Sequence, residues 1–337
     1  MPPTPDSPLA PDPLAAVLAA PGPASAFRLT RLALPPPGAG DVRIRHTVIG
    51  LDFIDVYHRS GRYALPPEAW PAILGVEAAG VVEAVGPGVT DLAPGDRVAY
   101  AGAIGAYAGA RNLAAARLVR IPDGVDDAAA ATALARGITV HMVASRVVAP
   151  RPGTIVLVLA AAGGLGAQLA RAAKRAGATV IGTVGSAAKL DLARAAGADH
   201  VIVGRDADLA AEIRRLTNGA LVDIAYDGVG GATLAKTLAC VRPFGTVVSL
   251  GEAGGPIPPI AAEELGLQRS LIFARPSVMQ FMRDVAAYRA AATAVLAEVA
   301  AGIPAPPAGP AFPLADVARA HEALEAGAFA GAATLIP

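Results

Sequence analysis

A glycine-rich turn constrains the fold of this chain more than any other part of its sequence. The turn reads Ala160-Ala161-Ala162-Gly163-Gly164-Leu165-Gly166. The expected strand Thr154–Leu159 precedes it, and the expected helix Leu165–Arg175 follows it. Small residues here let the chain turn sharply, let the backbone approach a pyrophosphate, and let the helix pack on the sheet. Against the pattern G-x-G-x-x-G, Ala161 replaces the first glycine, whereas Gly163 and Gly166 match. The turn therefore predicts a dinucleotide site, with phosphates held by N–H groups at the helix start.

Strands and helices alternate from residue 154 to about residue 274. Apolar runs predict strands at Thr154–Leu159, Thr179–Thr183, His200–Val203, Val222–Tyr226, Thr246–Leu250 and Ser270–Phe273. The segments between them predict helices at Leu165–Arg175, Ala187–Ala195, Ala207–Leu216, Ala232–Cys240 and Ala261–Leu267. Continuous apolar strands separated by helices are typical of a parallel sheet covered on both faces. The fold class is therefore α/β, with a Rossmann-type doubly wound parallel sheet.

The sequence on either side of this unit predicts a second, β-rich domain. From residue 27 to about residue 120, short runs such as Val42–Ile49 alternate with turns rich in proline and glycine. After residue 275, a helical stretch, the Pro-rich loop Ile303–Phe312 and a terminal strand at Ala332–Ile336 are expected. We predict that residues 1–136 and 275–337 form this domain and that residues 137–274 bind the dinucleotide. The first 26 residues are expected to be loosely attached, with a possible strand at Leu14–Ala20.

Composition excludes several classes of protein. A formal net charge of zero gives no long-range attraction to nucleic acid, so nucleic-acid binding is not expected as the main role. The single cysteine, Cys240, forms neither an intramolecular disulfide nor a cysteine-rich zinc site. The N-terminal segment lacks the basic start and apolar run of a signal peptide, which favours a cytoplasmic location. The uncharged stretch Pro152–Ala170 contains proline and several glycines, so we interpret it as a strand, turn and helix, not as a membrane span.

The end of the second strand indicates which dinucleotide is bound. Gly182 lies in that strand, and the chain continues through Gly185 to Ser186 without an acidic residue. NAD-binding folds usually place Asp or Glu here to bind the ribose 2′-hydroxyl, and a carboxylate would repel a 2′-phosphate. The hydroxyl of Ser186 and the ammonium of Lys189 would hold one, so the sequence predicts NADPH. The alternative is that Lys189 is simply a solvated lysine on the helix.

Several longer motifs resemble those of a known family. They are the segments 50–57, 59–63, 74–82, 95–98, 160–166, 226–230 and 275–277, and the closing Leu335-Ile336-Pro337. Together they are similar, from about Phe27 to Pro337, to the zinc-free NADPH:quinone oxidoreductase (ζ-crystallin-like) group of the medium-chain dehydrogenases/reductases. The resemblance implies a GroES-like catalytic domain beside the Rossmann domain, and a homodimer. The expected dimer contact is the edge strand Ser270–Phe273.

The resemblance also implies hydride transfer without a metal. Zinc enzymes of the family bind the metal through cysteine and histidine, whereas Val76 stands before Glu77 where histidine tends to occur. The five histidines are scattered without ligand spacing. We therefore expect no zinc ion as Lewis acid. Hydrogen-bond donors or a cation must then stabilise the negative charge that builds on the acceptor oxygen.

Tyr57, Arg275 and Asp52 are the candidate catalytic residues that the resemblance implies. Tyr57 offers a phenol donor, although it could instead be a packing aromatic residue. Arg275 offers a permanent cation, although it could instead contact a phosphate or the other domain. Asp52 is a departure, because relatives commonly have asparagine there, and an ionised acid close to the acceptor would disfavour the developing anion. Asp55 is interpreted as structural or as a hydrogen-bond acceptor on the cofactor side.

Further cofactor contacts follow from the resemblance and from the sheet. Thr139 matches a family position beside the nicotinamide amide. The turn at Leu250 and Gly251 follows the fifth strand, at the sheet edge where ligands bind. Phe273 and Arg275 are expected to line the same cleft. Relatives often have tyrosine after the third strand, where Arg205 could serve instead as a bidentate phosphate partner or could be solvated.

Three functions remain open from the sequence. The first is an NADPH-dependent quinone reductase. The second is an NADPH-dependent reductase of activated C=C bonds in enals or enones, since the same hydride geometry serves both acceptors. The third is a non-catalytic NADPH-binding or RNA-binding relative, against which the neutral charge, the glycine turn and Arg275 argue.

Overall fold

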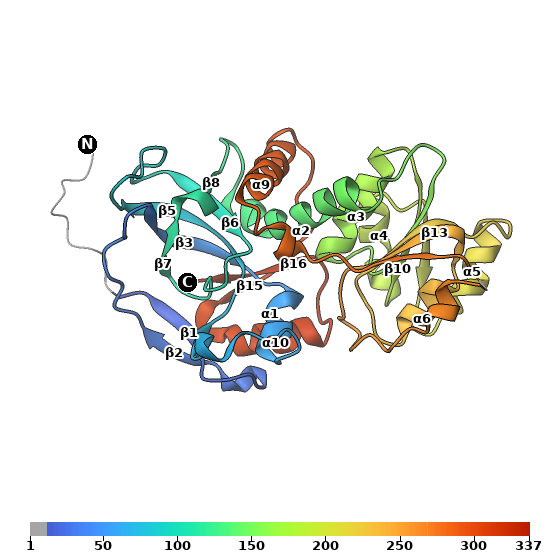
Figure 1. Cartoon of the computed structure of the whole chain (residues 1–337), viewed down its shortest axis with the longest axis horizontal. Helices are drawn as coiled ribbons and strands as arrows, with labels where there is room; N and C mark the ends of the chain where they lie inside the picture. Colours follow the sequence, from blue (N-terminus) through green and yellow to red (C-terminus); the bar gives the residue numbers. More distant parts are fainter. Residues whose placement is uncertain (1–11, 268) are drawn as a thin grey trace.

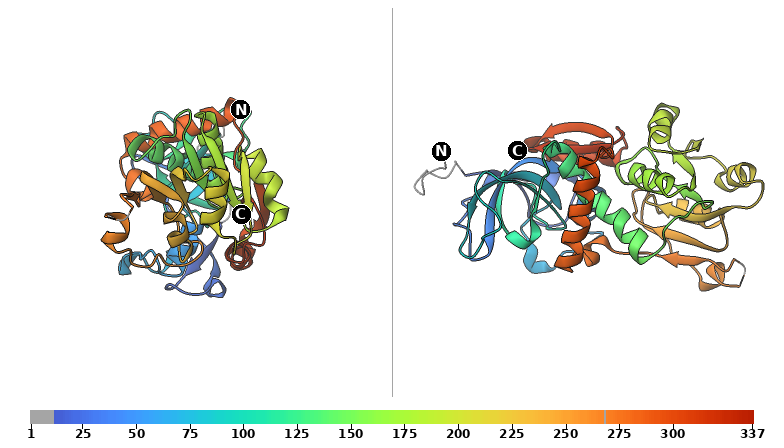
Figure 2. Two further views of the ribbon diagram at one scale, coloured as in Figure 1. Left: turned by 90° about the vertical axis from the view of Figure 1, so that its right-hand side faces the viewer. Right: turned by 90° about the horizontal axis from the view of Figure 1, so that it is seen from above.

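The molecule consists of two lobes joined by long helices. The computed structural model describes residues 12–267 and 269–337. Figure 1 shows a β-rich lobe, which holds the C-terminal end of the chain, beside a lobe built on a parallel sheet. The right-hand view of Figure 2 shows α2 (Asp127–Arg146) and α9 (Val285–Ala300) between them. Because α2 itself crosses residue 137, the exact domain limits stay a prediction.

The second lobe is the expected doubly wound sheet. Its strands are β9 (Ile155–Val158), β10 (Thr179–Val184), β11 (His200–Val203), β12 (Val222–Asp227), β13 (Val241–Ser249) and β14 (Ile272–Ala274). Its helices are α3 (Gly164–Arg175), α4 (Leu190–Ala195), α5 (Leu209–Leu216), α6 (Thr233–Leu238) and α7 (Ala262–Leu265). All strands are parallel, in the order β11-β10-β9-β12-β13-β14. The chain winds outward from β9 in one direction and then from β12 in the other, so the switch point lies between these two strands.

The alternation of side chains along each strand explains why helices cover both faces. Val156 and Val158 of β9 point into a core shared with α2 and α3, whereas Leu157 points into a core shared with α5 and α6. Successive residues of a strand face opposite sides of the sheet, so a strand buried on both sides is apolar throughout. This physical constraint made the strands visible in the sequence.

The first lobe is built on two sheets whose strands pair antiparallel, except for the parallel pair of β15 and β16. Its strands are β1 (Leu14–Leu18), β2 (Arg28–Arg31), β3 (Asp41–Gly50), β4 (Ala72–Ile73), β5 (Glu77–Val85), β6 (Arg97–Ala101), β7 (Ala110–Ala114), β8 (Val119–Arg120), β15 (Ala308–Pro313) and β16 (Ala332–Ile336). The larger sheet has the order β15-β16-β3-β5-β6-β8, with β7 also paired to β3, and the smaller has the order β2-β1-β4. The helices are α1 (Phe53–Arg59), α8 (Val278–Phe281) and α10 (Val317–Glu325). Because β16 pairs with β3, the C-terminal tail completes the sheet that the N-terminal part begins.

Two local expectations are wrong. Residues 12–26 are not loosely attached, because β1 pairs with β2 and β4, and Ala15, Ala16 and Leu18 are fully buried. The first eleven residues of that prediction lie outside the described part of the chain. The predicted loop Ile303–Phe312 instead enters strand β15, whose parallel partner β16 buries Phe312. Of the helices in the described residues, none has the length and apolar character needed to cross a membrane.

Candidate functional site

The glycine-rich turn has the geometry of a phosphate cradle. Ala160 adopts a positive φ of 52°, and Gly163 caps α3 without a hydrogen bond from any described side chain. A Cβ atom on Gly166 would lie 2.2 Å from the carbonyl oxygen of Ala160, so the helix packs on the turn only because that side chain is missing. A Cβ atom on Gly163 would lie 3.2 Å from the same oxygen. N–H groups without side-chain caps at the start of a twelve-residue helix fit an anionic pyrophosphate.

The residues expected at the 2′-phosphate lie on β10, just beyond its end, and beside residue 185. Gly182 lies on β10, where a Cβ atom would come within 2.7 Å of the Ala161 side chain. Ser186 is exposed just beyond β10. Lys189 donates from Nζ to the carbonyl oxygens of residues 327 and 329, at 3.2 and 3.1 Å. Arg205 lies close by, since a Cβ atom on residue 185 would be 3.3 Å from its Nε and one on residue 327 would be 3.3 Å from an Nη.

The remaining expected cofactor residues lie on α2, directly after β13 and on β14. Thr139 is buried in α2 and donates from Oγ1 to the carbonyl oxygen of Ala135 at 2.8 Å, which leaves its oxygen lone pairs available to accept. Leu250 follows β13, and its N–H donates to the carbonyl oxygen of residue 227 at 2.7 Å. A Cβ atom on Gly251 would lie 2.7 Å from the carbonyl oxygen of residue 228, so the backbones approach closely there. Phe273 lies on β14 opposite residue 247 of β13.

Tyr57 and Arg275 meet through a third residue, Glu252. Tyr57 lies on α1, is 5% exposed, and accepts a hydrogen bond from the backbone N–H of Glu252 at 2.7 Å. Burial raises the pKa of Tyr57 to about 12, so its hydroxyl stays protonated at neutral pH and can donate to a substrate. The guanidinium of Arg275 pairs with the carboxylate of Glu252. Two of the three candidate catalytic residues, Tyr57 on α1 and Arg275 directly after β14, therefore meet at Glu252 beyond the end of β13.

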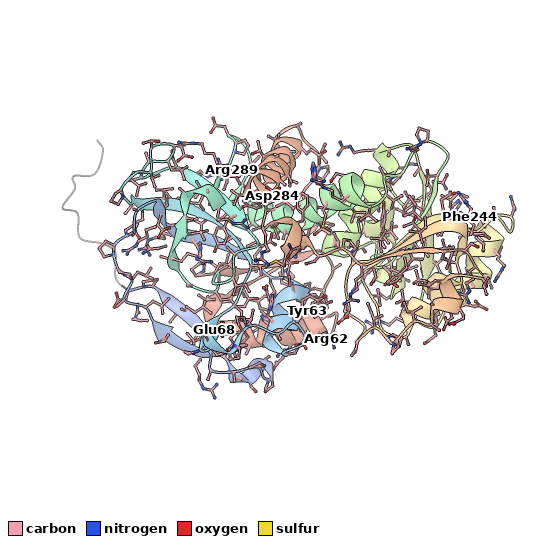
Figure 3. The ribbon with its side chains drawn as sticks, in the orientation of Figure 1. Arg62, Tyr63, Glu68, Phe244, Asp284 and Arg289 are labelled. Atoms are coloured by element: carbon pink, nitrogen blue, oxygen red, sulfur yellow. The ribbon has the colours of Figure 1, made fainter. Side chains whose placement is uncertain are left out.

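Arg62 and Tyr63 complete the surroundings of this point, and the sequence did not indicate their role. Arg62 donates from Nη1 to the carbonyl oxygen of Glu252 at 2.9 Å, and its Nε lies 3.6 Å from the carboxylate. The rings of Tyr57 and Tyr63 lie 4.9 Å apart between centroids. Figure 3 shows Arg62 and Tyr63 beside α1, on the side of the first lobe that faces the parallel sheet.

Asp52 belongs to a separate, buried group of charges. Arg136, on α2, places one Nη atom 2.5 Å from Asp52 and the other 2.9 Å from Glu77. Glu77 is fully buried, and desolvation, followed by the charge of Asp52, raises its pKa. Arg136 also packs against the glycine turn, because a Cβ atom on Gly164 would lie 2.5 Å from its Nε. Sequence reasoning missed Arg136; the signal was a single arginine next to a run of small and apolar residues three positions before Thr139.

Asp55 is fully buried and is hydrogen-bonded within the first lobe. Its Oδ2 accepts hydrogen bonds from the hydroxyl of Tyr107 at 2.9 Å and from the N–H of Asp52 at 3.1 Å. Burial, followed by the charge of Asp52, raises the pKa of Asp55 to about 8. The Nε2 atom of His321 lies 2.9 Å from the Tyr107 hydroxyl, and burial lowers the pKa of His321 to about 3. This cluster matches the structural interpretation of Asp55.

The other histidines of the first lobe also pack in the interior. His46 contacts the carbonyl oxygen of residue 108 through Nδ1, and burial lowers its pKa to about 4. His58 contacts the carbonyl oxygen of Tyr63 through Nδ1 at 3.0 Å. Within residues 12–267 and 269–337, no group of three His, Cys, Asp or Glu side chains is placed to hold a metal ion. Asp52 and Glu77 both pair with the guanidinium of Arg136, which provides the positive charge between them.

Comparison with known proteins identifies similar chains. Residues 38–123 match the alcohol dehydrogenase GroES-like domain, and residues 164–297 match the zinc-binding dehydrogenase family. A quinone oxidoreductase from Pseudomonas aeruginosa is 39% identical over 302 residues, which cover 89% of this chain and 92% of that protein. A 2-haloacrylate reductase from a Burkholderia species is 37% identical over 306 residues, with coverage of 89% and 92%.

Solved structures of NADPH complexes are also similar. The Escherichia coli quinone oxidoreductase complexed with NADPH has a TM-score of 0.89 and 33% identity, and the match covers 96% of this chain and 100% of that one. A mycobacterial protein complexed with NADPH has a TM-score of 0.90 and 37% identity, with the same coverage.

Proposed function

This chain belongs to the zinc-free quinone oxidoreductase group of the medium-chain dehydrogenases/reductases, and we propose that it reduces quinones with NADPH. The observation that carries the proposal is the meeting of Tyr57 and Arg275 at Glu252, on the strand-end edge of the parallel sheet. A phenol donor and a cation at this edge suit an acceptor whose oxygen becomes negatively charged. The names of similar proteins support the same activity.

NADPH is the cofactor, and when bound it supplies a hydride to the acceptor. The residues of the glycine turn and the start of α3 would hold its pyrophosphate, since the N-cap residue Gly163 provides no side-chain hydrogen bond to the first N–H groups of the helix. We propose that Ser186, Lys189 and Arg205 hold the 2′-phosphate. For Lys189 this requires the ammonium to exchange one of its carbonyl partners for a phosphate oxygen. Thr139 would accept a hydrogen bond from the nicotinamide amide.

At the acceptor end, the reaction needs one hydride and one proton to turn a quinone into a hydroquinone. We propose that Tyr57 donates a hydrogen bond to the acceptor oxygen, because its own oxygen already accepts from Glu252 and its proton is free to point elsewhere. Arg275 is 39% exposed and would stabilise the charge on that oxygen through its remaining N–H groups. The raised pKa of Tyr57 makes its phenol a weak acid, so water is the proposed source of the proton.

Asp52 was a candidate catalytic residue, and we propose a positioning role for it. Its carboxylate is 16% exposed and pairs with Arg136, which balances the charge that would otherwise oppose a developing anion. Its side chain and that of Asp55 also form a reciprocal cap at the start of α1. Asp52 would thereby fix the helix that presents Tyr57.

A second candidate function is reduction of an activated C=C bond. The similarity to a 2-haloacrylate reductase favours it, because that relative matches almost the same length of this chain as the quinone oxidoreductases do. The same donors would stabilise charge on the carbonyl oxygen conjugated to the reduced bond.

The direct test measures NADPH oxidation against a panel of quinones and of enals and enones, with NADH as control. We expect turnover of quinones with NADPH and much slower turnover with NADH. NADPH binding without turnover of any acceptor would contradict the proposal and would favour the non-catalytic alternative.

We also propose that the protein is a cytoplasmic homodimer. Edge strand β14 pairs with β13 on one side, and Ile272 on β14 is 55% exposed. Phe244 on β13, labelled in Figure 3, is 75% exposed on the same lobe. An antiparallel pairing of two β14 strands would cover the open edge. The single cysteine is unpaired, as is usual in a reducing compartment. A monomeric mass by light scattering would contradict the dimer.

A further inference from the structure

Glu252 occupies a position that the proposed reaction does not itself require. Its side chain is 9% exposed and lies between Arg275, with which it pairs, and the Nε of Arg62 at 3.6 Å. Its backbone forms two further hydrogen bonds with the first lobe. The N–H donates to the Tyr57 hydroxyl oxygen, and the carbonyl oxygen accepts from Arg62 at 2.9 Å. A fixed negative charge therefore lies beside the cation proposed to face the acceptor.

We propose that Glu252 sets the charge class of the acceptor: its carboxylate, held between Arg62 and Arg275, admits uncharged acceptors and discriminates against acceptors that carry an anionic group. This inference rests on the proposed function, because it concerns the same site. It separates this chain's expected substrates, neutral quinones and neutral enones, from substrates such as 2-haloacrylates, which are carboxylates at neutral pH.

The physical reason is competition for the same guanidinium. Carboxylates bind arginine through two parallel hydrogen bonds, and Glu252 already uses one Nη atom of Arg275. A second anion at Arg275 would lie next to the Glu252 carboxylate, whose side chain is only 9% exposed, and the two like charges would repel each other. A neutral carbonyl oxygen needs only one remaining N–H group and meets no such repulsion.

Arg62 limits the repulsion of anionic acceptors, and its charge determines the direction in which each substitution should change acceptor preference. Two guanidinium groups face one carboxylate, so the cluster keeps one surplus positive charge. That surplus still attracts the partial negative charge that develops on a neutral acceptor during hydride transfer. Removing the charge of Glu252 should therefore help an anionic acceptor more than a neutral one, since the anionic acceptor carries its own charge in addition to the developing one.

The kinetic test compares 1,4-naphthoquinone with its 2-sulfonate, using NADPH as reductant. The measured quantity is the ratio of kcat/KM for the sulfonate to kcat/KM for the neutral quinone, in wild type and in Glu252→Gln. Intrinsic differences in redox potential between the two quinones cancel in this comparison. We expect the ratio to rise at least tenfold in Glu252→Gln. Arg62→Gln should change it in the opposite direction, because it removes the surplus positive charge.

The matched control is Glu298→Gln. Glu298 also pairs with an arginine, Arg175, at 3.1 Å, but the pair is half exposed and joins the C-terminal ends of α3 and α9. This variant should leave the ratio unchanged. An equal rise in both glutamate variants would mean that net charge, not the position of Glu252, sets the preference, and would overturn the proposal.

A binding measurement separates this inference from the proposed function. Naphthalene-2-sulfonate cannot accept a hydride, and calorimetric titration gives its Kd without any turnover. We expect at least tenfold tighter binding to Glu252→Gln than to wild type, and weaker binding to Arg62→Gln. Unchanged Kd values in variants with wild-type circular dichroism would overturn the inference even if quinones are reduced. Absence of quinone turnover by wild type, with the expected Kd changes, would instead contradict only the proposed function.

Discussion

Two clusters of arginine and carboxylate groups lie near opposite ends of α1, and they differ in burial and in surplus charge. At the start of the helix, Arg136 is 7% exposed and faces two carboxylates, Asp52 and Glu77. Beyond its end, Arg62 and Arg275 are 31% and 39% exposed and face the single carboxylate of Glu252. The first cluster has one guanidinium for two carboxylates and is buried, whereas the second has two guanidinium groups for one carboxylate and is partly exposed.

The difference shows how the same pair of side-chain types serves two purposes. A buried ion pair gains little net stability, but breaking it is costly because one charge is left without a partner or water. A partly exposed pair is screened and can exchange its partner for a ligand. The buried cluster is thus suited to fixing α1 against α2 and the glycine turn, and the open cluster to meeting an acceptor.

The largest expected effect would come from breaking the buried cluster. Arg136→Met leaves the carboxylates of Asp52 and Glu77 without their cation, and should lower the free energy of unfolding by about 3–5 kcal/mol. Urea denaturation measures this change. The control is Arg175→Met, which breaks the half-exposed pair with Glu298 and should cost less than about 1 kcal/mol. An equal loss of unfolding free energy in the two variants would contradict this prediction, because it would mean that the buried and the exposed pairs contribute equally to stability.

The pH dependence of stability tests the burial of Asp55, which accepts a hydrogen bond from the N–H of Asp52 in the buried cluster. The pKa of Asp55 is raised from 3.8 to about 8 in the folded chain, so between these values the folded state binds more protons than the unfolded state. Stability is therefore highest at the low end of this window and falls as pH rises through it, by up to about 1.4 kcal/mol per pH unit. Asp55→Asn should reduce the fall of the free energy of unfolding between pH 5 and pH 8, as measured by urea denaturation at each pH. An identical slope in the variant would show that Asp55 is ionised throughout.

The open cluster should affect catalysis more than stability. Arg275→Ala removes the proposed cation beside the acceptor oxygen, and should lower kcat/KM for a neutral quinone about thirtyfold, or about 2 kcal/mol. The free energy of unfolding should change by less than about 1 kcal/mol, since the pair is partly exposed. Steady-state kinetics and urea denaturation on the same preparation measure both quantities. A large loss of stability with unchanged kcat/KM would reverse the roles assigned to the two clusters.

The sequence predicted the parts of the molecule that local patterns determine. The glycine turn and the apolar strands were visible because steric and burial requirements act on neighbouring residues, as at Gly166 and β9. Strand β15 was mistaken for a loop because its sequence is rich in proline. The strand is stabilised by pairing with β16, and the local sequence does not indicate that pairing.

The candidate site was only partly predictable for a related reason. Tyr57 and Arg275 belong to motifs, and Lys189 follows a strand end that lacks an acid, so all three could be named, although their roles stay predictions. The partners that surround them could not, because Arg62 and Glu252 are 190 positions apart in the chain and Arg136 and Glu77 are 59 apart. Glu252 could not be assigned a role from the sequence either, because its effect depends on two guanidinium groups that only the folded chain brings together.

The smallest expected effect extends the comparison to the cofactor. Gly185 lies where a Cβ atom would be 3.3 Å from Nε of Arg205, so Gly185→Asp would place a new carboxylate beside this guanidinium. By analogy with Glu252 and Arg275, the new carboxylate should occupy Arg205 and repel a 2′-phosphate, while it accepts a hydrogen bond from a ribose 2′-hydroxyl. The ratio of kcat/KM with NADPH to that with NADH should fall about tenfold, or about 1.4 kcal/mol. Gly185→Asn adds the same volume without the charge and should change the ratio far less. If both variants shift the ratio equally, the volume of the side chain at residue 185, not its charge, decides cofactor preference. An exposed carboxylate near a guanidinium would then not be sufficient to select the charge of a ligand.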